Sequence, residues 1–444
     1  MCTKSLPSAA QDLLPITTCG RVYTSGRLAN DLVTTATSCL TVNANNVTID
    51  GAGHSITAAQ FAIQWVDRSG ITIKNVVSTA NLQIYGAFAS KNVVTDSTFN
   101  QIAVYRGDDN VVRNSRMGKL LIYGMSNDPA QRATVTGNVI TRTLTKNEEK
   151  LVEIVTGLDG TREVDGTYHC ARGDHYIADN DIIGNVVTTD STVEPELLYL
   201  RCGMYSTVTG NRISSPQKAA GILLRDGADA NLIENNDVHI GVGNEGALLM
   251  QSGSAGYHHP RDNVFRGNTF RVDQGRSTWI QASQTRGNTF LNNVFRTDGG
   301  SAEMVRIADG VGVTTLFDHN TFYRTGLGTL VIFRDLNAGS HTFTSNIFMY
   351  GGSPTGVFDF DKAVSLAPYH GDYNVFFNSS GPVTFGQYGI TLPVWQSAGL
   401  DPHSVEANPG FVSPGSGDFD LSAGSAVIGD GANGTDPGAS PVAP

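Results

Sequence analysis

Long apolar runs are absent from this chain. No apolar stretch of 18 or more residues occurs among its 444 positions, so the sequence predicts no membrane-spanning helix. Helical heptads are absent as well, and charged residues make up only 16 %, which disfavours solvated helical faces. The net charge of −11 argues against a general nucleic-acid-binding protein.

Cysteine is scarce, and none of the five cysteines has the CxxC or Cys/His spacing typical of zinc sites. Cys19 and Cys39 flank the first expected strands and are one candidate disulfide; Cys170 and Cys202 are a second. Five buried, reduced thiols are the alternative. The polar, Ser/Ala-rich start after Met1 and Cys2 is typical of a trimmed mature N-terminus. We therefore expect a secreted, periplasmic or cell-surface protein.

Glycine, by contrast, is abundant at 50 residues, and an asparagine motif recurs along the chain. From Asn211 to Asn374 the intervals between the recurring asparagines are 25, 32, 25, 27, 26 and 28 residues. Each asparagine follows Gly, Asn or another turn residue, and short alternating apolar runs lie between them. A period of this length predicts a solenoid, because a propeller blade needs about 40 residues and a leucine-rich repeat needs a fixed Leu spacing.

The predicted fold is therefore all-β, a right-handed parallel β-helix of about 12 coils. We expect an N-terminal segment and cap over 1–36, the β-helix over 37–350, last coils and an irregular C-terminal cap over 351–430, and a flexible tail over 431–444. A long polar insertion over 141–196 interrupts the period near the middle. Long loops on a rigid scaffold often carry function. The ending resembles that of secreted carbohydrate-active β-helix proteins with the pectate-lyase-like fold.

Arginine is concentrated in the middle of the chain. Residues 201–334 contain 12 Arg and 1 Lys against 11 acidic residues, and after Arg334 only Lys362 is basic. Strand alternation predicts that Arg201 and Arg225 point outward on adjacent strands about 4.8 Å apart. Two neighbouring guanidinium groups need an anion between them, either a bound carboxylate or sulfate or a protein acid such as Asp226 or Glu194.

The same region resembles the core of the chondroitinase B and alginate lyase family. The resemblance rests on Glu-Pro-Glu-Leu-Leu-Tyr-Leu-Arg over 194–201 and on Gly-Ile-Leu-Leu-Arg over 221–225, followed by Asn-Leu-Ile-Glu-Asn-Asn over 231–236. It implies that Glu194 and Glu196 bind calcium, which neutralises a sugar carboxylate, and that Arg225 acts near the leaving oxygen.

Two positions depart from this family. Arg201 stands where the family has the lysine that abstracts the C5 proton, and Asp226 replaces a histidine. Arginine hardly deprotonates in proteins. If Arg201 is only an electrostatic clamp, the base is expected among Tyr199, His169, His175 and Lys150.

The resulting hypothesis is an extracellular polysaccharide lyase that cleaves a uronate-containing polysaccharide by β-elimination. The expected residues are Arg201, Arg225, Tyr199 and His169 for catalysis, Lys150, Gln251, His258 and Arg306 for substrate binding, and Glu194 and Glu196 for calcium. One alternative is a glycoside hydrolase or transglycosylase that uses Asp226 with Glu245, or Glu153 with Asp174. The other is a non-catalytic glycan-binding solenoid. The expected partner is a polysaccharide; the sequence indicates neither which one nor the oligomeric state.

Overall fold

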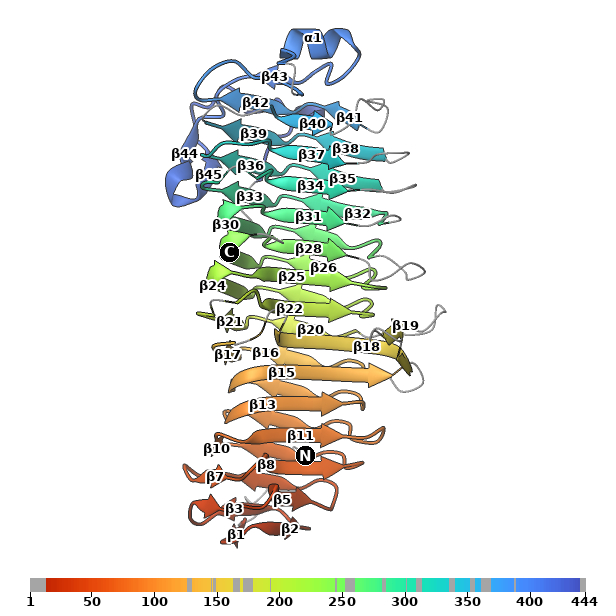
Figure 1. Ribbon diagram of the computed structural model, residues 1–444, viewed down its shortest axis with the longest axis vertical. Coiled ribbons are helices and arrows are strands. Elements are labelled where there is room, and N and C mark those ends of the chain that lie inside the picture. Colours follow the sequence, from red (N-terminus) through yellow and green to blue (C-terminus); the bar gives the residue numbers. More distant parts are fainter. Residues whose placement is uncertain are drawn as a thin grey trace, which may run out of the picture.

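The fold is that of a right-handed parallel β-helix, seen in a computed structural model (Figure 1). It describes residues 13–125, 130–144, 146, 149–162, 168–170, 179–191, 193–243, 246–251, 260–281, 285–300, 302–308, 314–334, 340–351, 356–360, 369–386 and 389–439. The side chains of 157–162, 168–170, 243, 281, 308 and 334 lie outside this description. The prediction of an all-β solenoid is confirmed.

Three rows of parallel strands run along the helix axis, and we call them face one, face two and face three. Face one is a 15-stranded sheet of mostly three-residue strands. Its strands are β1 (Leu14–Ile16), β3 (Gly26–Leu28), β6 (Thr48–Asp50), β9 (Thr72–Lys74), β12 (Val93–Thr95), β14 (Val111–Arg113), β16 (Thr134–Thr136), β20 (Asp181–Ile183), β23 (Thr207–Thr209), β26 (Leu232–Glu234), β29 (Val264–Arg266), β32 (Asn288–Leu291), β35 (Thr314–Asp318), β38 (Ser340–Thr344) and β41 (Tyr369–Asp372).

Faces two and three, together with β19 (Tyr168–Cys170), form the 28-stranded sheet. Face three contains β2 (Gly20–Val22), β5 (Ser38–Val42), β8 (Phe61–Val66), β11 (Asn81–Tyr85), β13 (Thr98–Tyr105), β15 (Arg116–Met125), β18 (Lys150–Arg162), β22 (Glu196–Arg201), β25 (Ala220–Arg225), β28 (Leu248–Gln251), β31 (Thr278–Gln281), β34 (Val305–Ala308), β37 (Val331–Arg334) and β40 (Phe358–Phe360). Face two contains β4 (Leu32–Val33), β7 (Ser55–Thr57), β10 (Val77–Ser78), β17 (Val139–Thr141), β21 (Val186–Thr188), β24 (Arg212–Lys218), β27 (Asp237–Gly243), β30 (Thr269–Gly275), β33 (Val294–Thr297), β36 (Thr321–Arg324), β39 (Ile347–Tyr350), β42 (Val375–Asn378) and β43 (Val405–Glu406). The long strands β13 and β15 pair into both faces and join them.

The recurring asparagines form a hydrogen-bonded ladder at the turn between faces one and two. In each step the side-chain oxygen accepts from the backbone N–H of the previous asparagine, as Asn268 does from Asn236 at 3.0 Å. The Asn268 side-chain amide also donates to the carbonyl of Ile233 at 2.8 Å. These bonds satisfy backbone groups that the bend leaves open. The preceding residue is left-handed, with φ of 54° at Asn235 and 63° at Gly267, which explains why Gly or Asn so often stands there.

The interior of the solenoid is a single apolar column whose composition changes along the chain. The N-terminal coils fill it with aliphatic residues such as Ile49, Ile73 and Val94. From β29 onward phenylalanines take over, and Phe290 stacks on Phe317 with ring centroids 4.5 Å apart and planes 7° apart. Each ring therefore packs flat against its equivalents in the neighbouring coils, as side chains in the same register of a parallel stack must.

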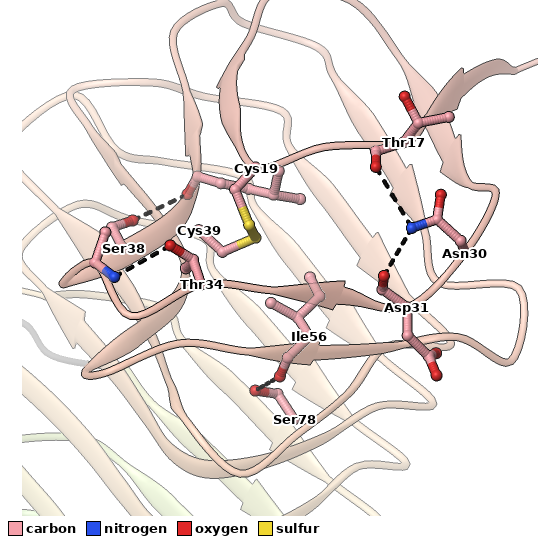
Figure 2. The surroundings of a disulfide bond; sticks show 11 residues. Thr17, Cys19, Asn30, Asp31, Thr34, Ser38, Cys39, Ile56 and Ser78 are labelled. Carbon is pink, nitrogen blue, oxygen red and sulfur yellow. Dashed lines mark hydrogen bonds between the residues drawn. A yellow bond between two sulfur atoms is a disulfide. The ribbon is translucent and has the colours of Figure 1, made fainter.

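A disulfide joins the first coils. Cys19 and Cys39 are bonded, with their Cα atoms 4.6 Å apart (Figure 2), which confirms that candidate pair. Cys39 lies on β5 and Cys19 directly precedes β2, so the bond ties neighbouring strands of face three together. Cys202 is disulfide-bonded as well. The side chain of Cys170, its expected partner, lies outside the described residues, so that pairing stays a prediction.

The chain folds back on itself after the last coils (Figure 1). Helix α1 (Leu392–Ser397) lies over the C-terminal end of the column, where Trp395 packs flat on Phe385 with centroids 4.8 Å apart. The antiparallel pair β44 (Phe411–Ser413) and β45 (Asp418–Leu421) then lies beside face two, with the short helices η1 (Pro414–Ser416) and η2 (Ala432–Gly434). Phe419 meets Tyr323 of β36 edge to face at 5.1 Å.

Candidate active site

The predicted site residues Tyr199, Arg201, Arg225, Gln251 and Arg306 lie on face three, in two rows that follow the strand register. Tyr199 pairs with Leu223, which pairs with Leu249, and the row continues through Trp279 to Arg306. In the second row Arg201 pairs with Arg225. Gln251 and then Gln281 follow in the same register. The alternating residues Leu198, Leu200, Ile222 and Leu224 belong to the interior core, so the predicted outward direction is confirmed.

Asp226 lies between the two arginines. Its carboxylate is fully buried and accepts a 2.8 Å hydrogen bond from Nε of Arg201. Nε of Arg225 lies 3.9 Å from the same oxygen, which is too far for a hydrogen bond. A protein acid thus supplies the anion that the arginine pair requires. This carboxylate interacts chiefly with Arg201. This pairing makes Arg201 a structural clamp, because both members of the pair are almost completely buried.

Arg225 is the cation with the least complete set of partners at this site. Its Nε is buried and has no hydrogen-bond partner among the described residues. Its guanidinium is hydrogen-bonded to the hydroxyl of Tyr199, and its side chain is 26 % exposed. A partly exposed guanidinium with unused donors is well suited to a carboxylate or sulfate ligand.

Tyr199 was expected to be a candidate base, and its environment disfavours that role at neutral pH. Only 4 % of the residue is exposed, and it packs with Val155, Leu223 and Leu249 in an apolar cluster outside the main core. Burial raises the pKa of the hydroxyl well above its usual range, and the charges of Arg201 and Arg225 only partly offset this effect. Tyr199 is therefore a protonated hydrogen-bond partner of Arg225.

Lys150 is the other described residue proposed as a base. Its ammonium lies 3.0 Å from Glu196 and 4.8 Å from the centre of the Tyr199 ring, and its side chain is 20 % exposed. Together, Lys150, Arg201 and Arg225 face two carboxylates, those of Glu196 and Asp226. Counted over these described side chains, the cluster carries one positive charge in excess, which matches a monoanionic sugar residue.

The two glutamates expected to bind calcium do not fit a calcium site in the described arrangement. Glu194 is paired with Lys218 at 2.9 Å, and Glu196 is paired with Lys150. Among the residues that the structure describes, no group of three or more His, Cys, Asp or Glu side chains converges as a metal site. Calcium takes six to eight oxygen ligands, and amines occupy these carboxylates instead. The calcium hypothesis gains no support from the described donor set.

A second charged cluster lies further along the same face and includes two residues that sequence reasoning missed. Arg306 contacts Glu303, and Arg276 binds the same carboxylate at 2.7 Å. Both guanidinium groups lie over the Trp279 ring, at 4.7 Å for Arg276 and 5.2 Å for Arg306. Burial alone would raise the pKa of Glu303, but the two arginines lower it overall. Aligning the coils would have placed Arg276 beside Glu303, because Thr278 pairs with Val305.

Several expected site residues lie outside the described part of the chain. His258, His175, Glu245 and Asp174 are among them, and His169 lies on β19 (Tyr168–Cys170) with its side chain undescribed. Gln251 follows Arg225 in the outward row. Glu153, the remaining acid of the hydrolase pairs, is bound to Lys119 at 2.8 Å. The described structure therefore brings together Lys150, Glu196, Tyr199, Arg201 and Arg225, and places Arg306 in the separate second cluster.

Comparison with known proteins defines the class. Residues 168–324 match the family model of the right handed beta helix region, which agrees with the observed stack. A search of curated proteins found no match. The match and the strand topology establish a right-handed parallel β-helix, a fold compatible with carbohydrate-active enzymes. No helix in the described residues has the length and apolar character needed to cross a membrane.

Proposed function

We propose that the protein is an extracellular polysaccharide lyase acting on a uronate-containing polysaccharide. The observation that carries this proposal is Arg225, a partly exposed guanidinium in a cluster whose described side chains carry one excess positive charge. A uronate carboxylate would bind the exposed part of this guanidinium and supply the missing negative charge. The Cys19–Cys39 disulfide supports an oxidising location outside the cytoplasm.

β-Elimination needs the sugar carboxylate to be neutralised, a base to remove the C5 proton and an acid to protonate the leaving oxygen. Arg225 would bind the carboxylate, while the buried Arg201–Asp226 pair holds its surroundings in place. The base takes the C5 proton, the double bond forms between C4 and C5, and the C4–O bond breaks. Lys150, whose side chain is partly exposed beside Tyr199, would donate a proton to the departing oxygen. Among the predicted bases, His169 stays the candidate for the C5 proton.

The experiment is incubation with a panel of uronate polysaccharides, following the ultraviolet absorbance of the unsaturated product. The wild-type protein should generate this absorbance. Arg225→Ala should reduce the rate at least about 100-fold, because one charge-stabilising donor is lost. Arg212→Ala is the matched control, because Arg212 is exposed on β24 of face two. Equal loss in both variants, or full activity of Arg225→Ala, would place the site elsewhere.

The same assay separates the alternatives. New reducing ends without ultraviolet absorbance would indicate a hydrolase, and retention of polysaccharide without any cleavage would indicate a binding solenoid. The described acids do not favour the hydrolase, because Asp226 and Glu153 are each bound to a cation and their proposed partners lie outside the described residues.

A further inference from the structure

Three tyrosines form a row on the outer side of face three, N-terminal to the arginine cluster. Tyr85 of β11, Tyr105 of β13 and Tyr123 of β15 are register partners on successive coils. Their ring centroids are 5.9 and 6.1 Å apart along the row. Tyr85 is 41 % exposed, and the other two are half-buried. We call these three residues the tyrosine strip.

The rings of the tyrosine strip do not cover one another. Their planes are tilted by 51° between Tyr85 and Tyr105 and by 54° between Tyr105 and Tyr123. In the interior, Phe317 and Phe343 lie only 5° from parallel, so that each ring shields the next. The tilt of the outer rings leaves part of their apolar surface open for a ligand.

Unused polar groups accompany these rings. Gln64 and Gln83 are register partners in the neighbouring outward row, and both are half-buried. Within the described part of the chain, neither glutamine amide makes a hydrogen bond, and neither do the hydroxyls of Tyr85 and Tyr105. Open rings beside free amides and hydroxyls match a ligand with apolar faces and many hydroxyl groups, which is the surface of a pyranose ring.

The charge around the tyrosine strip is nearly balanced. Lys119 and Glu153 neutralise each other at 2.8 Å, and Arg106 lies 6.0 Å from the centre of the Tyr85 ring. Among the described residues, this surface lacks the row of cations that a nucleic acid or another polyanion would require. Val66, the register partner of Tyr85 on the preceding coil, is 56 % exposed and extends the apolar surface.

The strip adjoins the proposed catalytic cluster on face three, because Tyr123 packs against the apolar cluster that contains Tyr199, but the two surfaces are not continuous. Val155 and Arg201 stand between Tyr123 and Arg225 in the same row, and both are at least nine-tenths buried. A ligand on the strip therefore cannot follow this row continuously to Arg225. We propose that the tyrosine strip is an accessory glycan-binding site, which holds a polysaccharide chain by stacking on its sugar faces rather than by charge. This binding does not depend on the proposed cleavage reaction.

Affinity electrophoresis through gels that contain neutral β-glucan, alginate or chondroitin sulfate tests the proposal. Retardation of the wild-type protein by at least one of these glycans is expected. Tyr105→Ala should weaken the affinity about tenfold, as expected for the loss of one stacking ring. Tyr105→Phe retains the ring and should keep most of the affinity. Tyr205→Ala removes a 52 % exposed tyrosine elsewhere and serves as the control.

The outcomes distinguish the strip from the catalytic proposal. Arg225→Ala should bind neutral glycan as the wild type does, even when it no longer cleaves. If no cleavage is ever detected, the strip proposal still stands on the loss of binding in Tyr105→Ala. The strip proposal is overturned if the wild type and Tyr105→Ala bind equally well. It is also overturned if none of the glycans retards the wild-type protein. Self-association that is abolished by Tyr105→Ala would also overturn it and assign the strip to a second copy of the chain.

Discussion

Aromatic rings in the interior of the solenoid and on the outer side of face three are arranged in opposite ways. Inside, Phe317 lies between Phe290 and Phe343 at centroid distances of 4.5 and 4.7 Å, with nearly parallel planes. Outside, Tyr105 lies between Tyr85 and Tyr123 at about the same coil spacing, but tilted and partly open. The same stacking of coils therefore produces a sealed ladder inside and an accessible one outside. Inner rings contribute stability, whereas outer rings are available for binding.

The largest expected effect is on the inner ladder. Phe317→Ala should lower the free energy of unfolding by about 3–5 kcal/mol, because it leaves a cavity between two stacked rings. Tyr85→Ala removes a similar ring from the outside and should cost less than about 1 kcal/mol. Urea denaturation followed by circular dichroism measures both. Similar losses in the two variants would contradict the distinction between sealed and open ladders.

The next effect concerns a buried histidine of face one. His341 is fully buried and its Nδ1 lies 2.8 Å from the hydroxyl of Thr315. Burial, helped by the nearby His370, lowers its pKa from 6.5 to about 4. The folded state therefore resists protonation, so its stability is complete above the unfolded pKa of 6.5 and falls as the pH drops toward 4.

Between about pH 7 and pH 5 this single group should reduce the free energy of unfolding by about 2 kcal/mol. The measurement is the difference in urea stability between those two conditions for the wild type and for His341→Gln. The variant lacks the titrating group, so its stability should change less over that range. An identical pH dependence in both proteins would show that His341 is already protonated, or solvated, in the folded state.

The smallest effect separates the roles of Tyr199 and Arg225 on the outer side. Tyr199→Phe keeps the buried ring and removes only the hydroxyl that is hydrogen-bonded to Arg225. We expect the elimination rate to fall by about tenfold or less and the stability to change by about 1 kcal/mol. Product absorbance and urea denaturation check the two values. Loss of activity as complete as in Arg225→Ala would restore a direct proton-transfer role for Tyr199.

Much of this outer surface could be predicted from the sequence, because the asparagine period sets the register of the coils. It placed Arg201 beside Arg225 and put both outside, where the structure has them. The period did not indicate whether the anion beside the arginines is a bound ligand or a protein acid. For Arg201 the structure shows a protein acid, the buried carboxylate of Asp226. The burial that disfavours a base role for Tyr199 was not predictable either, since alternation indicates direction but not how deeply an outward side chain is covered.

Irregularities in the period explain what was missed. The register shifts between Asn81 and Leu82 where β11 pairs with β8, near the tyrosine strip. The asparagine intervals, which begin at Asn211, do not set the register of these N-terminal coils. Arg276 and Glu303 were missed because both precede their strands, outside the apolar runs that mark the coils. Contacts between turns depend on loop paths, which a periodic pattern does not encode.

The sequence by itself determined the solenoid, the asparagine ladder and the inward or outward direction of the strand residues. These follow from local chemistry repeated in every coil: a left-handed residue, an amide that bonds to the next coil, and period-two alternation. Only the tertiary structure decided which outward charges neutralise one another and which stay available. That outcome depends on distances and burial between residues many positions apart. Arg201 is satisfied by Asp226 while Arg225 keeps an unused donor, although their strands look alike in the sequence.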